Sequence, residues 1–191
     1  MKKSPRILDY KADLIKRIEY SLDGQLATVH IPWDDIREYS DEYNPNVLIL
    51  EEMRLVEGVE VAIAIKTYPD GKLTGKIRCA SDAPVADKIA GYFGGGGHPY
   101  AAGFRTYDIS YDETIKELIK IIPEILNEKE TIMDNVKSYD FTDTETRAML
   151  ANFLFHDDEV YKRVSVLSPG EKASVALCKT KKKKANLIIL D

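Results

Sequence analysis

A run of four glycines followed by a histidine is the segment of this sequence best suited to chemistry. Residues 94–103 read Gly-Gly-Gly-Gly-His-Pro-Tyr-Ala-Ala-Gly. Consecutive glycines gain no packing and lower backbone stability, which a domain tolerates where its backbone must approach something closely. Successive N–H groups can form a concave anion site, and His98 can donate to a phosphate oxygen or act in acid–base chemistry. The sequence therefore predicts an anion-binding loop, with a flexible turn as the alternative.

A second candidate for anion binding lies near the end of the sequence. Ser168-Pro169-Gly170-Glu171 is a capping-box pattern with proline at the first helical position. Exposed N–H groups and the helix dipole at such a terminus favour an anion. Asn186 to Leu190 then predicts a short apolar strand, and the carboxylate of Asp191 after it could lie beside a nucleotide-bound Mg²⁺. Taken singly, each feature also fits a purely structural role.

The spacing of apolar residues predicts the elements that must position these segments. Alternation of apolar and polar residues indicates strands, and a three-to-four residue spacing indicates helices. The expected helices are 8–20, 46–56, 84–93 and one from 111 that contains Pro123, and the expected strands are 26–31, 59–67, 73–78 and 101–106. The turn 69–72 joins two of these strands into a hairpin. We expect an α/β (α+β) fold, a mixed sheet flanked by helices, followed by a mostly helical, incomplete C-terminal segment.

Composition and charge exclude several classes of protein. The chain has 191 residues with 44% apolar and 31% charged side chains, which is typical of a soluble globular protein. It contains no apolar run of the ~20 residues that a membrane helix needs. Cys79 and Cys178 have no metal-ligand spacing, so a reduced, cytoplasmic setting is expected. Residues 1–128 carry 16 basic and 22 acidic side chains and residues 129–191 carry 11 and 10, which supports a division into domains 1–128 and 129–191.

The glycine–histidine string, with a strand ending Lys76-Ile77-Arg78 before it, resembles the DHH-associated C-terminal domain of DHH-family phosphoesterases. The resemblance covers about 8–127 and is to the oligoribonuclease and phosphoadenosine phosphate phosphatase type. It implies that the loop and the arginine bind substrate phosphate. The implied substrate-binding residues are Arg78, Gly94, Gly95, Gly96, Gly97 and His98. Cys79 stands where the family often has serine, which removes a possible hydroxyl contact.

The catalytic half of that family has no counterpart in this sequence. There, a DHH domain supplies aspartate and histidine ligands for a pair of Mn²⁺ or Mg²⁺ ions. This chain has no Asp-His-His triplet, and its histidines are His30, His98 and His156. The resemblance thus implies binding of a nucleotide or short RNA or DNA oligonucleotide, with no catalytic residue, metal ligand or cofactor. A DHH catalytic domain on another chain, and a homodimer, remain open as partners.

Residues 131–191 resemble the stretch of an ABC-F ATPase from the signature motif to the Walker B strand. The resemblance implies that Ser168 and Gly170 contact the γ-phosphate of Mg-ATP and that Asp191 holds Mg²⁺. Pro169 stands where the family usually has glycine, and no Walker A loop precedes the segment, since 71–77 has the wrong spacing. The sequence ends before the family's catalytic glutamate, so no ATPase activity is expected. A ribosome-associated ATP-binding fragment is the alternative function.

Overall fold

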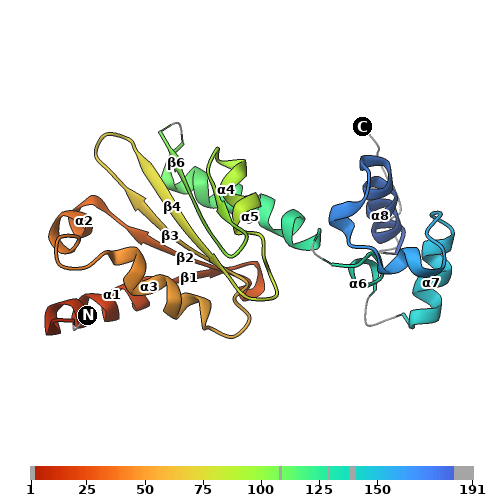
Figure 1. The fold of residues 1–191 in the computed structure, drawn as a ribbon, viewed down its shortest axis with the longest axis horizontal. Helices are drawn as coiled ribbons and strands as arrows, with labels where there is room; N and C mark the ends of the chain where they lie inside the picture. Colours follow the sequence, from red (N-terminus) through yellow and green to blue (C-terminus); the bar gives the residue numbers. More distant parts are fainter. Residues whose placement is uncertain (1–2, 108, 129, 138–140, 183–191) are drawn as a thin grey trace. The chain divides into compact units, whose positions relative to one another are not determined.

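The computed structural model describes residues 3–107, 109–128, 130–137 and 141–182, and the chain divides into two compact units, Met1–Ile125 and Leu126–Asp191 (Figure 1). Asp191 and the strand expected at 186–190 lie outside the described residues. Among the described helices, none combines the length and the apolar composition needed to cross a membrane.

The first unit contains a six-stranded sheet with the order β1-β2-β3-β4-β6-β5. The strands are β1 (Glu19–Ser21), β2 (Leu26–Ile31), β3 (Val61–Thr67), β4 (Leu73–Cys79), β5 (Gly96–His98) and β6 (Ala101–Thr106). β2 and β3 run parallel and every other neighbouring pair is antiparallel, so the sheet is mixed. The fold class expected from the sequence is confirmed.

Among the described residues of this unit, five α-helices lie on the two faces of the sheet, and a 3₁₀ helix, η1 (Leu22–Gly24), joins β1 to β2. The α-helices are α1 (Pro5–Lys16), α2 (Trp33–Tyr39), α3 (Pro45–Arg54), α4 (Ala86–Tyr92) and α5 (Tyr111–Asn127), which continues past Pro123 into the second unit. Helices α1 to α3 pack on one face, where Ala62 and Ala64 join their core. On the opposite face, Tyr111 of α5 stacks on His30 and Phe93, after α4, stacks on Phe104.

Helices α1 to α3 cover only part of their face. The core cluster beneath them takes its sheet residues from β2 and β3, and no described residue of β4, β5 or β6 belongs to it. Side chains of the latter three strands that point to this face are therefore left outside the core. On β4 these side chains are polar, because Thr74, Lys76 and Arg78 alternate with the buried Leu73, Gly75 and Ile77.

Several elements differ from the sequence expectations. The helix expected at 8–20 begins at Pro5, where the Ser4 side chain accepts from the Ile7 N–H, and ends at Lys16. The segment Glu19–Ser21 is instead the strand β1, because it pairs with β2. Helix α2 and the short strand β5 inside the glycine run were not expected. In contrast, the hairpin of β3 and β4 is confirmed, as are the bounds of β2 and β6.

The second unit is helical over its described residues. It contains α6 (Ile132–Val136), α7 (Asp143–Ala151), the 3₁₀ helices η2 (Asp157–Tyr161) and η3 (Val164–Val166), and α8 (Pro169–Lys182). Its core is separate and includes Ile132, Leu150 and Cys178, each fully buried. Capping boxes open α7 at Thr142 and α8 at Ser168, as the sequence predicts.

Candidate functional site

The uncovered half of the sheet displays basic side chains in three rows. Residues that pair across neighbouring strands project from the same face, so the register places each row. The rows are Arg78–Ala101–His98, Lys76–Gly103–Gly96 and Lys66–Thr74–Arg105. The register thus brings the predicted Arg78 to the same face as part of the glycine run.

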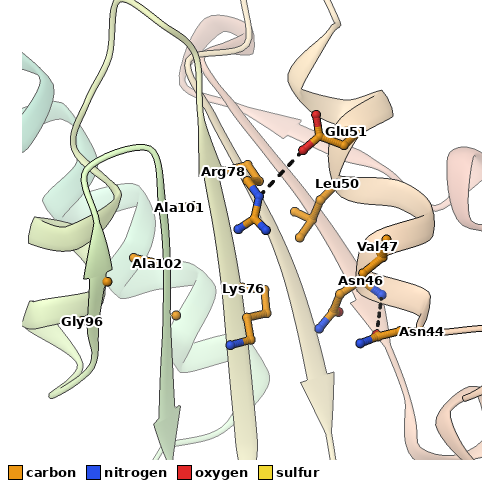
Figure 2. A pocket seen from close by; sticks show the side chains of 12 residues that line it. Asn44, Asn46, Val47, Leu50, Glu51, Lys76, Arg78, Gly96, Ala101 and Ala102 are labelled. Atoms are coloured by element: carbon orange, nitrogen blue, oxygen red, sulfur yellow. Dashed lines mark hydrogen bonds and ion pairs between the residues drawn. The ribbon is translucent and has the colours of Figure 1, made fainter.

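A groove follows these rows between α3 and β4 (Figure 2). A central hollow of about 450 Å³ is lined by Lys76, Arg78 and Gly96, with Asn46 and Glu51 of α3 opposite. It shares residues with two further hollows at its ends. The Lys66 hollow, of about 540 Å³, also contains Arg105, and the Tyr100 hollow, of about 400 Å³, also contains Arg54. We use "groove" for these three hollows together.

Arg78 is held at the wall of the groove but keeps donors for a ligand. Its Nε lies 3.8 Å from Oε1 of Glu51, and its Nη1 donates to the Ile77 carbonyl at 2.9 Å. Glu51 also accepts from Arg54 at 2.9 Å, so it is shared between two guanidinium groups. A guanidinium has five N–H donors, and these contacts leave most of those on Arg78 for an anion.

The first two glycines of the run close helix α4. Gly94 has a φ of +72°, and its N–H donates to the Gly91 carbonyl at 3.0 Å. The Gly95 N–H donates to the Ala90 carbonyl at 2.8 Å. These two bonds form a Schellman motif, in which glycine tolerates the left-handed conformation. The N–H groups of Gly94 and Gly95 therefore end the helix and do not contribute to an open anion concavity.

The next glycines let β5 lie against β6 and leave the groove open. A Cβ on Gly95 would lie 2.3 Å from the Gly103 carbonyl oxygen, and one on Gly97 would lie 2.6 Å from the Cα of Ala102. A Cβ on Gly96 would meet nothing within 4 Å. The close approach made by Gly95 and Gly97 is thus to the protein itself, although Gly97 also lines the central hollow and Gly94 and Gly95 line the Lys66 hollow. Gly96, in the central hollow, leaves open space where a ligand could approach the backbone.

His98 lies at the outer end of the Arg78 row and is exposed. Its Nδ1 accepts from the Tyr100 N–H at 3.3 Å, and its ring stacks on Tyr100 with centroids 5.6 Å apart. Because Nδ1 accepts, the neutral ring carries its proton on Nε2, which can donate to a ligand. His98 is not among the residues that line the three hollows, so it would contact only a ligand that extends past Ala101.

Sequence reasoning missed the basic and amide residues along the rest of the groove. Lys66 is buried, and its Nζ donates to Oδ1 of Asn44 at 3.2 Å. Burial lowers the pKa of Lys66, and the nearby charge of Lys76 lowers it further. The alternation of Thr74, Lys76 and Arg78 on β4 was a readable signal of a polar stripe. No sequence pattern indicates Lys66, because it ends an apolar strand.

The predicted nucleotide contacts of the second unit lie at the start of α8. The Ser168 hydroxyl donates to Oε2 of Glu171 at 2.6 Å, and the Ser168 N–H donates to the same atom at 2.7 Å. These bonds lower the pKa of Glu171. Gly170 is exposed in the same turn. The chain's own carboxylate therefore occupies this helix terminus.

Within the described ranges, no three side chains of histidine, cysteine, aspartate or glutamate come together as a group that could hold an ion. The residues described do not provide a ligand set for the pair of divalent ions that the resemblance associates with a DHH domain.

A known family model matches part of the first unit. The model of the DHHA1 domain matches residues 37–128, which contain α3, the hairpin, the glycine run and all of α5. The match identifies a DHH-associated domain in this part of the chain, in agreement with the resemblance drawn from the glycine–histidine string.

Comparison with individual proteins gives one solved structure that shares the fold and two partial similarities. The crystal structure of an exopolyphosphatase-related protein from Bacteroides fragilis superposes with a TM-score of 0.55 and 16% identity over 65% of this chain. PggH, a pGpG-specific phosphodiesterase from Vibrio cholerae, gives a TM-score of 0.46 at 15% identity, covering 62% of this chain and 40% of that one. YdiF of Bacillus subtilis (strain 168), which is named for ATP binding, is 55% identical over 47 residues, 25% of this chain. The chain spans 37% of the Bacteroides protein and 7% of YdiF.

Proposed function

We propose that the first unit binds the phosphate groups of a nucleotide or short oligonucleotide in the groove. One observation carries this proposal. Five basic side chains and a single carboxylate, Glu51, line the three hollows of a chain whose net charge is −5. The basic residues are Arg54, Lys66, Lys76, Arg78 and Arg105. A local excess of positive charge in an acidic protein favours an anionic ligand over nonspecific attraction to nucleic acid.

Each element of the groove has a role in that binding. A phosphate in the central hollow accepts from Arg78 and Lys76, and it competes with Glu51 for the Arg78 guanidinium. The missing side chain of Gly96 lets the phosphate approach the edge of the sheet. Nε2 of His98 donates to the part of the ligand that extends beyond Ala101. Charge-assisted hydrogen bonds of this kind are shorter and stronger than neutral ones.

Calorimetric titration with adenosine monophosphate and diadenylate tests the proposal. Loss of one charge-assisted contact weakens binding by about 10- to 100-fold, which is the expected effect of Arg78→Ala. Arg37→Ala is the matched control, because Arg37 is an exposed arginine of α2 that pairs with Asp34 outside the groove. Equal affinities of wild type and Arg78→Ala for both ligands would overturn the proposal.

A second proposal concerns the catalytic partner. The DHHA1 match and the partial coverage of the Bacteroides protein support a chain that works together with a separate DHH domain. The chain alone is then expected to bind and not to hydrolyse. Addition of a separately produced DHH domain with Mn²⁺ should release mononucleotides from diadenylate. Mn²⁺-dependent release by the purified chain alone would contradict this.

A third proposal concerns the second unit, which we infer derives from an ABC-F-type ATP-binding protein. The match of part of the chain to YdiF and the position of Ser168 and Gly170 at the start of α8 support this origin. Because Glu171 occupies that terminus, we expect weak Mg-ATP binding and no turnover. Sustained ATP hydrolysis by the purified chain would contradict this expectation, and co-sedimentation with ribosomes would test the association expected of that family.

A further inference from the structure

Lys66 is a buried cation for which the described part of the chain provides no carboxylate partner. Only 7% of its surface is exposed. Its polar contact among the described residues is to the neutral Asn44 side chain, whose Oδ1 lies 3.2 Å from Nζ. Buried lysines are otherwise almost always paired, because an unpaired charge is unfavourable away from water. The folded chain therefore maintains an unfavourable charge that an anion could neutralise.

The other basic groups around Lys66 make binding of an anion there more favourable. The Lys66 hollow contains two further basic residues, Lys76 and Arg105, and no carboxylate among its lining residues. Lys76 lies close enough to lower the pKa of Lys66 in addition to the effect of burial. Repulsion between the two ammonium groups is relieved when a negative group lies between them.

Asn46 supplies a second and independent sign of a ligand at this end of the groove. Its side chain is 6% exposed, yet its Oδ1 has no hydrogen-bond partner among the described residues. It lines both the central hollow and the Lys66 hollow, and Figure 2 shows it pointing from α3 toward β4. A buried amide oxygen without a partner is unfavourable. Rotation of the amide lets Asn46 accept from a ligand hydroxyl or donate to a phosphate oxygen.

We propose that Lys66 and Asn46 form a second phosphate subsite, so that the groove takes a ligand with several phosphates along one chain. This rests on the proposed function of the groove. The Lys66 row and the Arg78 row are separated by four residues along the strands, about 13 Å at ~3.3 Å per residue. A mononucleotide engages one row, whereas a 5′-phosphorylated trinucleotide can engage all three.

The test compares adenosine monophosphate with 5′-phosphorylated triadenylate on wild type, Lys66→Met and Lys66→Arg, by calorimetry. We expect wild type to bind the trinucleotide more tightly. Lys66→Met should weaken trinucleotide binding about 10- to 100-fold and lower the slope of its salt dependence by about one. It should weaken binding of the monophosphate far less than binding of the trinucleotide, and Lys66→Arg should restore most of the trinucleotide affinity. Lys120→Met, an exposed lysine of α5, is the control.

Tryptophan fluorescence gives a local readout of the same event. Trp33 is the single tryptophan of the chain, and its ring lies 5.7 Å from Tyr68, which lines the Lys66 hollow. The trinucleotide should change this fluorescence in wild type and not in Lys66→Met. Inorganic tripolyphosphate is a further probe. If Lys66→Met weakens tripolyphosphate binding as it weakens trinucleotide binding, the subsite accepts a bare phosphate chain. If Lys66→Met weakens only trinucleotide binding, the subsite requires a nucleotide.

The outcomes separate this inference from the proposed function. If wild type binds neither nucleotide, the proposed function of the groove fails. If wild type binds both equally, or Lys66→Met binds the trinucleotide as wild type does, only the second subsite fails. If Lys66→Met lowers the melting temperature and weakens both ligands alike, Lys66 is a structural residue and the second subsite is overturned.

Discussion

The groove of the first unit and the start of α8 both have sequences that favour an anion, and they differ in where the anion comes from. At α8, Glu171 of the chain itself accepts from the Ser168 N–H and hydroxyl. In the groove, Glu51 is the single carboxylate among five basic residues. A glycine-rich loop or a capped helix thus indicates affinity for negative charge. Whether a ligand site remains depends on whether the fold supplies that charge itself.

The largest expected difference between the two regions comes from adding a methyl group to a glycine in each. Gly95→Ala should lower the free energy of unfolding of the first unit by about 2–3 kcal/mol, because the new Cβ would lie 2.3 Å from a backbone oxygen of β6. Gly170→Ala should be neutral or slightly stabilising, since nothing lies within 4 Å of its Cβ in a helix.

Denaturant unfolding measures both effects, with Trp33 fluorescence reporting the first unit and hydrogen exchange of α8 the second. Gly96→Ala serves as the control within the glycine run, because its Cβ also meets nothing within 4 Å. A stability of Gly95→Ala within 0.5 kcal/mol of wild type, about the range of neutral surface changes, would contradict the close approach of β5 to β6.

A smaller difference is expected when the capping hydroxyl of α8 is removed. Ser168→Ala should lower the stability of the second unit by about 1 kcal/mol, the usual effect of losing a helix cap. It should leave the affinity for diadenylate unchanged, whereas Arg78→Ala reduces that affinity. Hydrogen exchange and calorimetry measure the two quantities. A loss of diadenylate affinity in Ser168→Ala would show that α8 takes part in binding and would remove the contrast between the regions.

The smallest differences are expected in the dependence of stability on pH. The pKa of Lys66 lies below its ordinary value of 10.5, through burial first and Lys76 second. The unfolded chain then binds the proton more tightly, so the free energy of unfolding rises as pH increases from the folded pKa toward 10.5. The pKa of Glu171 lies below 4.5 through its bonds from Ser168. Its contribution is present above pH 4.5 and is lost as the pH falls through the folded pKa.

Chemical unfolding across pH measures both steps in the same protein. Lys66→Met should remove the alkaline step and keep the acid one. Glu171→Gln should keep the alkaline step and reduce the acid one, which carboxylates such as Glu145 and Glu159 share because their pKa values are lowered too. An alkaline step that survives in Lys66→Met would mean that another group, and not the unpaired cation of the groove, causes it.

Local sequence patterns predicted much of the first unit. The alternation from Val61 to Arg78, with the turn between, predicted the central hairpin, because a two-residue period needs no information from the rest of the chain. The capping boxes at Ser110 and Thr142 also formed as expected, since their bonds join residues three apart. In contrast, β1 was missed, because Glu19–Ser21 is a strand only through its pairing with β2.

In the candidate site, too, some features follow from the local sequence and others depend on how distant segments meet. The types of residue in the glycine run and Arg78 already indicated phosphate binding. The use of Gly94 and Gly95 to end α4 and the position of Gly96 in the groove depend on where α4, β5 and β6 meet, which no local pattern states. The basic residues of the groove other than Arg78 were missed for the same reason, since they come from β3, β4, β6 and α3.

The hairpin, the helix caps, the DHHA1 resemblance and the chemistry of the glycine run follow from the amino-acid sequence alone, because each depends on neighbours along the chain. Only the tertiary structure decided that Lys66, Lys76 and Arg78 share one face. It also decided that α1 to α3 stop short of that half of the sheet and that Lys66 is buried without a carboxylate among the described residues. Strand register and the extent of helix cover are set by packing between distant segments, and they turned separate basic residues into one groove.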